Sequence, residues 1–81
     1  MFFVYLIQND NGQLYIGFTD NLERRMAEHA SGKVTTTHRL GFGKLLYYES
    51  YDQEELAKER EKKLKQFGSS YVGLKKRLKL K

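Results

Sequence analysis

Four kinds of reactive side chain occur along this chain at informative spacings. Tyr5 and Tyr15 stand ten residues apart. Arg25 and His29 stand four apart, so a helix would place them on one side. Glu61 follows among basic residues, where a carboxylate can be a single ligand for a hard metal ion or half of an ordinary helix ion pair. Phenol, guanidinium, imidazole and carboxylate groups are the reactive groups that this chain offers.

Several standard sites are absent from the sequence. The chain has no Cys, which excludes disulfides, cysteine zinc sites and thiol catalysis. It has no His-Glu-x-x-His motif and no serine in a nucleophile elbow. Gly43-Lys44 is no phosphate loop, because His38 stands where the first glycine is needed and no Ser or Thr follows.

The N-terminal segment predicts a β-hairpin. Phe2–Gln8 and Gln13–Phe18 are predicted strands, because they are rich in aromatic and aliphatic residues and are bounded by turn formers. The stretch Asn9-Asp10-Asn11-Gly12 between them is a turn signal.

The length of that turn decides which side chains share a face. A three-residue loop with Gly12 in the left-handed region would put Tyr5, Tyr15 and Gly17 on one face of the sheet. A two-residue turn would separate the tyrosines. We favour the longer loop because it gathers the aliphatic residues on the other face: Val4, Leu6, Leu14 and Ile16. The phenol face would then be open to a ligand beside Gly17.

Capping patterns and apolar periodicity predict the middle of the chain. Asp20 and Glu23 form a capping-box pattern that opens a helix ending near Gly32. Its apolar stripe consists of Leu22, Met26 and Ala30. A third strand is predicted over Lys44–Ser50.

Two further helices are predicted in the C-terminal third. Asp52 and Glu55 form the second capping pattern. The apolar stripe that follows consists of Leu56, Ala57, Leu64 and Phe67. After Gly68-Ser69-Ser70, a last helix has an apolar side formed by Tyr71, Leu74 and Leu78. The order β-β-α-β-α-α predicts one α+β domain over residues 1–81, a three-stranded antiparallel sheet with helices on at least one face.

Charge is divided unevenly along the chain. Residues 1–57 carry five Lys and Arg against eight Asp and Glu, a net of −3, whereas residues 58–81 carry ten against two, a net of +8. A basic C-terminal third suggests a polyanion, most often nucleic acid, although a solubilising face has the same composition. No apolar run is long enough to span a membrane, and with no Cys we expect a cytoplasmic protein.

Taken one at a time, the reactive residues have ordinary explanations. Tyr5 and Tyr15 suit strand aromatics in a core or at an edge. Arg25 and His29 suit a helix surface, and Glu61 suits a solvated helix position. Only the ordered combination points to a particular chemistry.

Four blocks in order resemble the GIY-YIG nuclease superfamily. They are Val4-Tyr5-Leu6, Tyr15-Ile16-Gly17, the stretch Asn21–Arg25 with His29, and Arg60-Glu61. The resemblance covers nearly the whole chain and is closest to small stand-alone bacterial members. The superfamily also includes the N-terminal incision domain of the bacterial repair excinuclease and the catalytic domains of homing endonucleases. It implies a GIY-YIG-like fold and metal-dependent hydrolysis of phosphodiester bonds in DNA, as in repair or recombination.

The resemblance also implies roles for single residues. The implied catalytic residues are Tyr5, Tyr15, Arg25, His29 and Glu61. Glu61 matches the glutamate that holds one divalent ion, Mg²⁺ or Mn²⁺, and Arg25 would neutralise charge on the phosphate oxygens. Tyr5 could be the general base if nearby cations lower its pKa, and His29 is the rival base with a pKa already near neutrality. Both assignments remain open.

The expected partner is nucleic acid, DNA rather than RNA. A protein partner is compatible with the sequence, which does not identify one. The expected substrate contacts are Gly17, Thr37, His38, Arg39, Lys75, Lys76, Arg77 and Lys79. The sequence departs from the family at His38-Arg39, where relatives carry Arg-Pro, and no Asn follows Asn21. Two alternatives stay open: a nucleic-acid-binding module with weak or lost hydrolysis, and an interaction protein whose basic helix meets an acidic partner.

Overall fold

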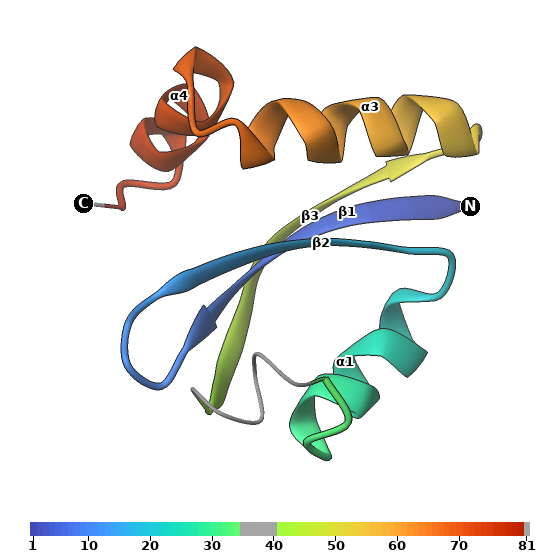
Figure 1. The fold of residues 1–81 in the computed structure, drawn as a ribbon, viewed down its shortest axis with the longest axis vertical. Coiled ribbons are helices and arrows are strands. Elements are labelled where there is room, and N and C mark those ends of the chain that lie inside the picture. Colours follow the sequence, from blue (N-terminus) through green and yellow to red (C-terminus); the bar gives the residue numbers. More distant parts are fainter. Residues whose placement is uncertain (35–40, 81) are drawn as a thin grey trace.

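The strands form one antiparallel sheet in the order β2-β1-β3 (Figure 1). A computed structural model describes residues 1–34 and 41–80. The elements of these residues are β1 (Phe2–Asn9), β2 (Leu14–Thr19), α1 (Leu22–Ala30), β3 (Phe42–Tyr51), α3 (Glu54–Lys65) and α4 (Ser69–Arg77). The predicted α+β fold with a three-stranded antiparallel sheet is confirmed. The predicted substrate contacts Thr37, His38 and Arg39 lie outside the described residues.

The β1–β2 hairpin has the three-residue loop. Gly12 has a φ of 87°, and its N–H donates to the carbonyl oxygen of Asn9 at 2.9 Å. Tyr5 lies opposite Gly17 in the ladder, which puts Tyr15 on the same face as both. The predicted shared face of the two tyrosines is therefore confirmed.

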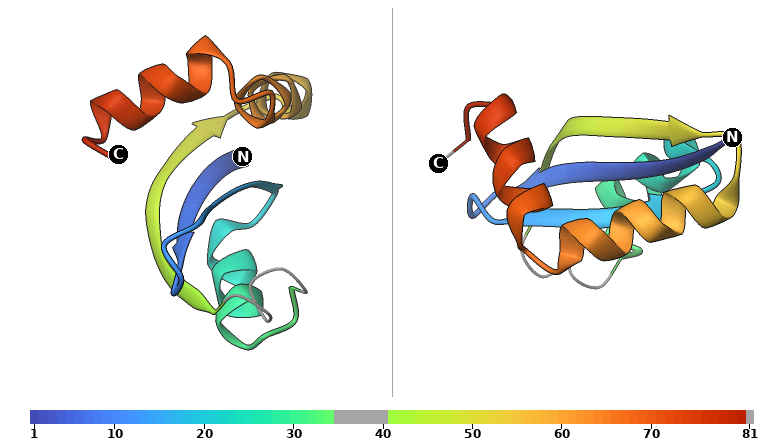
Figure 2. Two further views of the ribbon diagram at one scale, coloured as in Figure 1. Left: turned by 60° about the vertical axis from the view of Figure 1, so that its left-hand side comes forward. Right: turned by 90° about the horizontal axis from the view of Figure 1, so that it is seen from above.

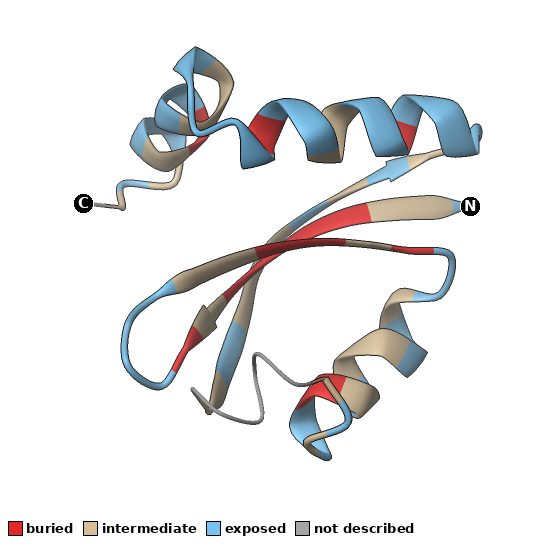
Figure 3. Ribbon diagram, viewed as in Figure 1, coloured by how far each residue is buried: buried red, intermediate tan, exposed pale blue. Residues whose placement is uncertain are grey.

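The two faces of the sheet are covered by different helices. α3 and α4 lie over one face and α1 lies over the other (Figure 2). Beneath α3 and α4 lies the apolar core, whose buried residues are Val4, Leu6, Ile16, Ala57, Leu64 and Leu74. Burial is concentrated in the two N-terminal strands and at isolated helix positions (Figure 3). Within the described residues, no helix is long and apolar enough to cross a membrane.

Both predicted helix starts are one residue too early. α1 is capped by Asn21, whose side-chain oxygen accepts from the backbone N–H of Arg24 at 3.0 Å, and not by Asp20. Asp20 instead pairs with the Arg24 guanidinium at 2.7 Å. α3 is preceded by Gln53 at the cap position rather than by Asp52, and Gln53 makes no side-chain cap hydrogen bond.

Three residues predicted on apolar stripes are exposed instead. They are Ala30, Leu56 and Phe67. On α1, His29 is buried in place of Ala30, so the inner side of this helix is more polar than its periodicity indicates. α3 buries only Ala57 and Leu64, which are seven residues apart and form a narrow line. Phe67 lies past the end of α3.

Candidate active site

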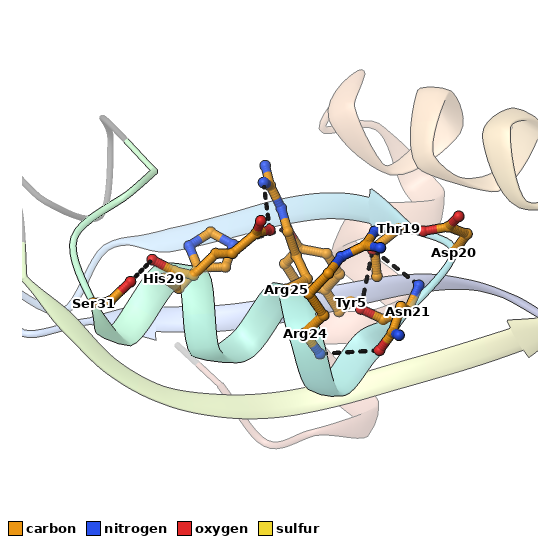
Figure 4. A network of polar contacts seen from close by, with 9 residues as sticks. Tyr5, Thr19, Asp20, Asn21, Arg24, Arg25, His29 and Ser31 are labelled. Carbon is orange, nitrogen blue, oxygen red and sulfur yellow. Dashed lines mark hydrogen bonds and ion pairs between the residues drawn. The ribbon is translucent and has the colours of Figure 1, made fainter.

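β1 and α1 bring three of the predicted catalytic side chains into direct contact. The hydroxyl oxygen of Tyr5 lies 2.8 Å from Nε2 of His29. Nε of Arg25 donates to the same oxygen at 3.3 Å. Figure 4 shows Tyr5 on the sheet with Arg25 and His29 reaching it from α1. Tyr5 and His29 are both 1% exposed, so a buried phenol lies between an imidazole and a guanidinium.

Gly17 makes the position of the phenol possible. A Cβ at Gly17 would overlap Cζ and the hydroxyl oxygen of Tyr5. The ring of Tyr5 therefore lies directly over the backbone of β2, in the space that the sequence predicted to be open to a ligand. That prediction of an open face is wrong, because Tyr5 itself fills the space.

Aromatic rings enclose the imidazole of His29. The ring of Tyr15 lies 5.4 Å from it at 71°, and the ring of Phe42 stacks on it at 6.1 Å and 23°. Tyr15 also lies 6.3 Å from the ring of Tyr5. We call Tyr5, Tyr15, Arg25 and His29 the α1-face cluster. The polar imidazole of His29 therefore packs against three aromatic side chains, those of Tyr5, Tyr15 and Phe42.

Burial decides the protonation states in this cluster. It raises the pKa of Tyr5 to about 12, although the hydrogen bond from Arg25 acts in the opposite direction. It lowers the pKa of His29, and the positive charge of Arg25 lowers it further, against a smaller opposing effect of Glu28. The condition on which Tyr5 could act alone as the general base, a pKa lowered by nearby cations, is therefore not met. At pH 7 the phenol is protonated and the imidazole neutral. The phenolic oxygen accepts from Arg25, and the tautomer of His29 sets the direction of its hydrogen bond with Tyr5.

The guanidinium of Arg25 extends from this buried contact to the surface. One of its terminal nitrogens lies 3.3 Å from Oε1 of Glu28, and both side chains are 32% exposed. The two residues line a hollow of about 300 Å³ that also reaches Phe18 of β2 and Glu54 of α3. Arg25 therefore joins the buried phenol to an open hollow beside β2.

Glu61 lies apart from the α1-face cluster. It belongs to α3, and its side chain, 22% exposed, forms an ion pair with Lys65 at 3.2 Å. Its charge contributes to raising the pKa of Tyr5, after the larger effects of burial and of Tyr15. The structure thus brings four of the five predicted catalytic residues together and leaves Glu61 within electrostatic range of the phenol.

Glu61 fits a divalent ion as a single protein ligand. In the described part of the chain, no three His, Cys, Asp or Glu side chains are grouped as a metal centre. Mg²⁺ does not need such a group, because it keeps several waters and is held by one or two carboxylates together with substrate phosphates. The ion pair of Glu61 is with a half-exposed lysine, which can leave the carboxylate at little cost.

The predicted basic contacts lie away from this cluster. Lys75, Lys76 and Arg77 belong to α4 and Lys79 follows it, on the other face of the sheet from α1 (Figure 2). Lys75 and Lys79 line a hollow of about 490 Å³ together with residues of the β1–β2 turn.

A second polar cluster was missed from the sequence. Glu49 of β3 accepts from Nε and Nη2 of Arg60 at 2.9 and 3.1 Å, and from the hydroxyls of Tyr47 and Tyr51 at 2.7 and 2.6 Å. We call these four residues the α3-face cluster. The alternation Tyr47-x-Glu49-x-Tyr51 places all three on one side of a strand and could have indicated it. Glu28 was also missed, although it stands three residues after Arg25 on the same helix.

The comparisons with known proteins agree with this geometry. A family model described as the GIY-YIG catalytic domain matches residues 1–75. The chain belongs to the GIY-YIG family. GIY-YIG nucleases generally depend on a divalent metal and act on nucleic acid.

Several similar proteins carry the name UPF0213. One from Orgyia pseudotsugata multicapsid polyhedrosis virus is 55% identical over 29 residues, which cover 36% of this chain and 28% of that protein. One from Streptococcus pyogenes serotype M5 is 39% identical over 57 residues, covering 68% of this chain and 61% of that protein. The matched segments therefore span less than two thirds of these relatives. The solution NMR structure of a UPF0213 protein from Bacillus halodurans matches 98% of this chain and 86% of that one, with a TM-score of 0.59 and 29% identity. This GIY-YIG chain is thus similar in sequence and in fold to small UPF0213 proteins.

Proposed function

We propose that this GIY-YIG chain hydrolyses phosphodiester bonds in DNA with the help of a divalent metal ion. The observation that carries the proposal is the buried contact of Tyr5 with His29 and Arg25. The phenolic oxygen accepts from Arg25 and shares a hydrogen bond of 2.8 Å with the imidazole, so a proton can pass between the two rings.

In this proposal the base is a pair of residues rather than one. The hydroxyl oxygen of Tyr5 takes a proton from the attacking water, while the phenolic proton passes to Nε2 of His29, 2.8 Å away. The water oxygen forms the new bond to phosphorus. The bond from phosphorus to the 3′-oxygen breaks with its electron pair on that oxygen, which is then protonated from solvent. In sum the water proton passes to His29, which becomes an imidazolium and later releases the proton to solvent, while Tyr5 is neutral before and after the transfer, in keeping with its raised pKa.

Arg25 and Tyr15 would orient the reacting groups. The outer nitrogens of Arg25 face the hollow beside β2, where a planar guanidinium can pair with two oxygens of a phosphate. Tyr15, packed against both Tyr5 and His29, would position the water. Glu61 would hold the divalent ion, whose chemistry is to polarise the phosphate and stabilise the leaving oxygen.

The test compares two glutamates of α3 on nicked, branched and supercoiled DNA with Mg²⁺ or Mn²⁺. Glu61→Gln should lower cleavage at least 100-fold, because the carboxylate that would hold the ion is lost. Glu59→Gln is the matched control, since Glu59 also forms an ion pair with a lysine four residues later but is 62% exposed. It should cleave like the wild type. Cleavage by Glu61→Gln at the wild-type rate would contradict the proposal.

The burial of Tyr5 favours one second candidate, a nucleic-acid-binding module without hydrolysis. At 1% exposure the phenol has almost no surface in contact with water. Equal binding of DNA by the wild type and Glu61→Gln, with no cleavage by either protein under any of these conditions, would support that module instead.

A further inference from the structure

An exposed apolar patch lies where α3 meets α4. Phe67 is 62% exposed and Val72 is 46% exposed. Together with Tyr71 and Leu80 they line a hollow of about 340 Å³, whose remaining lining residues are Lys75 and Lys76. We call this hollow the α3–α4 platform. Large apolar side chains side by side at a surface usually mark a binding site.

The backbone at Phe67 is unfavourable for an aromatic residue. Its φ is 56°, and it stands just past the C-cap of α3, a position that usually holds glycine. The next residue is Gly68, so a glycine is nearby but not at the strained position. The ring packs edge-on against Tyr71 at 4.9 Å and 89°, with most of its surface exposed. A strained residue that buries little of its ring is not explained by stability of the fold.

The charges around the platform select the kind of ligand. Nζ of Lys75 lies 5.4 Å from the ring centre of Tyr71, and Lys76 lines the same hollow. The chain offers a useful contrast in Tyr48, which is 53% exposed and lines a hollow with the acidic residues Asp20 and Glu23. An aromatic ring among lysines suits a ligand with both a flat apolar group and a negative charge. An unpaired nucleotide has both, because its base stacks on aromatic rings and its phosphate pairs with cations.

We infer that Phe67 and Tyr71 form a stacking site for an unpaired base of a nucleic acid strand. This inference rests on the proposed function and deepens it, because it names single-stranded segments as part of the substrate. Five residues separate Phe67 from Glu61, and the four of them that belong to α3 rise roughly 6 Å along its axis. A strand whose phosphate lies near Glu61 would therefore need only a short unpaired segment to reach the platform.

Fluorescence anisotropy with labelled oligo(dT) and with a labelled duplex of equal length tests this site. Phe67→Gly should weaken oligo(dT) binding about tenfold, the usual effect of losing one base stack, and leave duplex binding within twofold. Phe67→Trp should retain oligo(dT) binding. Tyr48→Ser, the exposed aromatic in acidic surroundings, should change neither. Lys76→Ala should weaken both ligands together, because a phosphate contact does not depend on unpaired bases.

Thermal unfolding separates this site from a structural role of Phe67. Glycine relieves the positive φ, so Phe67→Gly should unfold within a few degrees of the wild type. A large fall in Tm with unchanged oligo(dT) binding would overturn the inference, as would equal loss of duplex and oligo(dT) binding. The inference would also be overturned if the wild type sedimented as a dimer and Phe67→Gly as a monomer, because the platform would then bind a second copy of the chain.

The outcomes for the platform and for hydrolysis are distinguishable. Cleavage that depends on Glu61, together with unchanged oligo(dT) binding by Phe67→Gly, removes the platform and keeps the proposed function. The expected effect of Phe67→Gly without cleavage by the wild type keeps the platform and removes hydrolysis. A wild type that binds no oligonucleotide removes both.

Discussion

The two faces of the sheet each hold a cluster of tyrosine and arginine, and the clusters differ in what completes them. On the face covered by α3, the Glu49 carboxylate accepts four hydrogen bonds, two from Arg60 and one from each of two tyrosines. On the face covered by α1, the central group is the phenol of Tyr5, which is hydrogen-bonded to Nε2 of His29 and accepts from Nε of Arg25. The same residue types therefore gather around a charged carboxylate on one face and around a neutral phenol on the other.

The two clusters also differ in the charge of their central group. Burial alone would raise the pKa of Glu49, but the hydrogen bonds from Arg60 and the two phenols outweigh it and lower the pKa. All of these groups are thus in their most stable protonation state. In the α1-face cluster, burial drives the phenol and the imidazole toward their neutral forms, and the charge of Arg25 is only partly balanced by Glu28 at 3.3 Å. If the proposed hydrolysis holds, this is the cluster that would transfer protons.

The largest expected effect on stability comes from removing the carboxylate of Glu49, which accepts all four hydrogen bonds of the α3-face cluster. Glu49→Ala should lower the free energy of unfolding by about 3 kcal/mol, because Arg60 and two phenols lose their shared acceptor. The side chains of the ion pair are largely buried, with 15% of Glu49 and 23% of Arg60 exposed. Tyr5→Phe should cost about 2 kcal/mol, because buried His29 and partly exposed Arg25 each lose one hydrogen bond but no charged group loses its counterion. Urea unfolding at constant m-value measures both changes.

Cleavage assays should reverse that order. Tyr5→Phe should abolish most of the proposed activity, whereas Glu49→Ala should keep it in the fraction of molecules that remains folded. A Tyr5→Phe protein as unstable as Glu49→Ala, or one that cleaves DNA like the wild type, would show that the two clusters do not differ as described.

A smaller effect is expected at the glycine that makes room for Tyr5. Gly17→Ala introduces a Cβ that overlaps the phenol, so the ring must turn away from His29 and Arg25. We expect a loss of about 2 kcal/mol and of the proposed activity. Gly73→Ala is the matched control, because Gly73 lies within α4 with no atom within 4 Å of the new Cβ. It should stabilise the protein by about 0.5 kcal/mol. Equal effects of the two substitutions would contradict the tight fit over Gly17.

The fold could be predicted from the sequence largely because local signals agree with the tertiary contacts. The loop ending in Gly12 sets the hairpin register, and that register alone puts Tyr5, Tyr15 and Gly17 on one face. The predicted helix starts failed by one residue because several polar residues precede each helix. Which of them caps it depends on how the chain leaves the preceding strand.

The site was less predictable because its chemistry depends on burial. Helical spacing put Arg25 and His29 on one side of α1, but periodicity gave the inner position to Ala30 rather than to His29. The expectation that nearby cations could lower the pKa of Tyr5 left out burial of the phenol, which has the larger effect and raises that pKa. Residue spacing does not report how completely a ring is buried, so the direction of the pKa shift of Tyr5 could not be obtained from it.

Acid titration gives the smallest predicted effect and separates the two faces most directly. Because the pKa of His29 is lowered in the folded protein, the unfolded chain binds this proton first as the pH falls below about 6.5. Stability should therefore fall as the pH is lowered from 7.5 toward 5.5. The pKa of Glu49 is also lowered, but its contribution is lost only below the ordinary range of a carboxyl, near pH 4.5.

Urea unfolding at several pH values checks this window. His29→Gln should remove the slope between pH 7.5 and 5.5. A slope that survives in His29→Gln would place the titrating group elsewhere. Alkaline unfolding cannot replace this experiment, since the pKa values of Tyr5 and Tyr51, one on each face, are both raised to about 12. Only the acid side distinguishes an imidazole kept neutral by burial from a carboxylate kept charged by its donors.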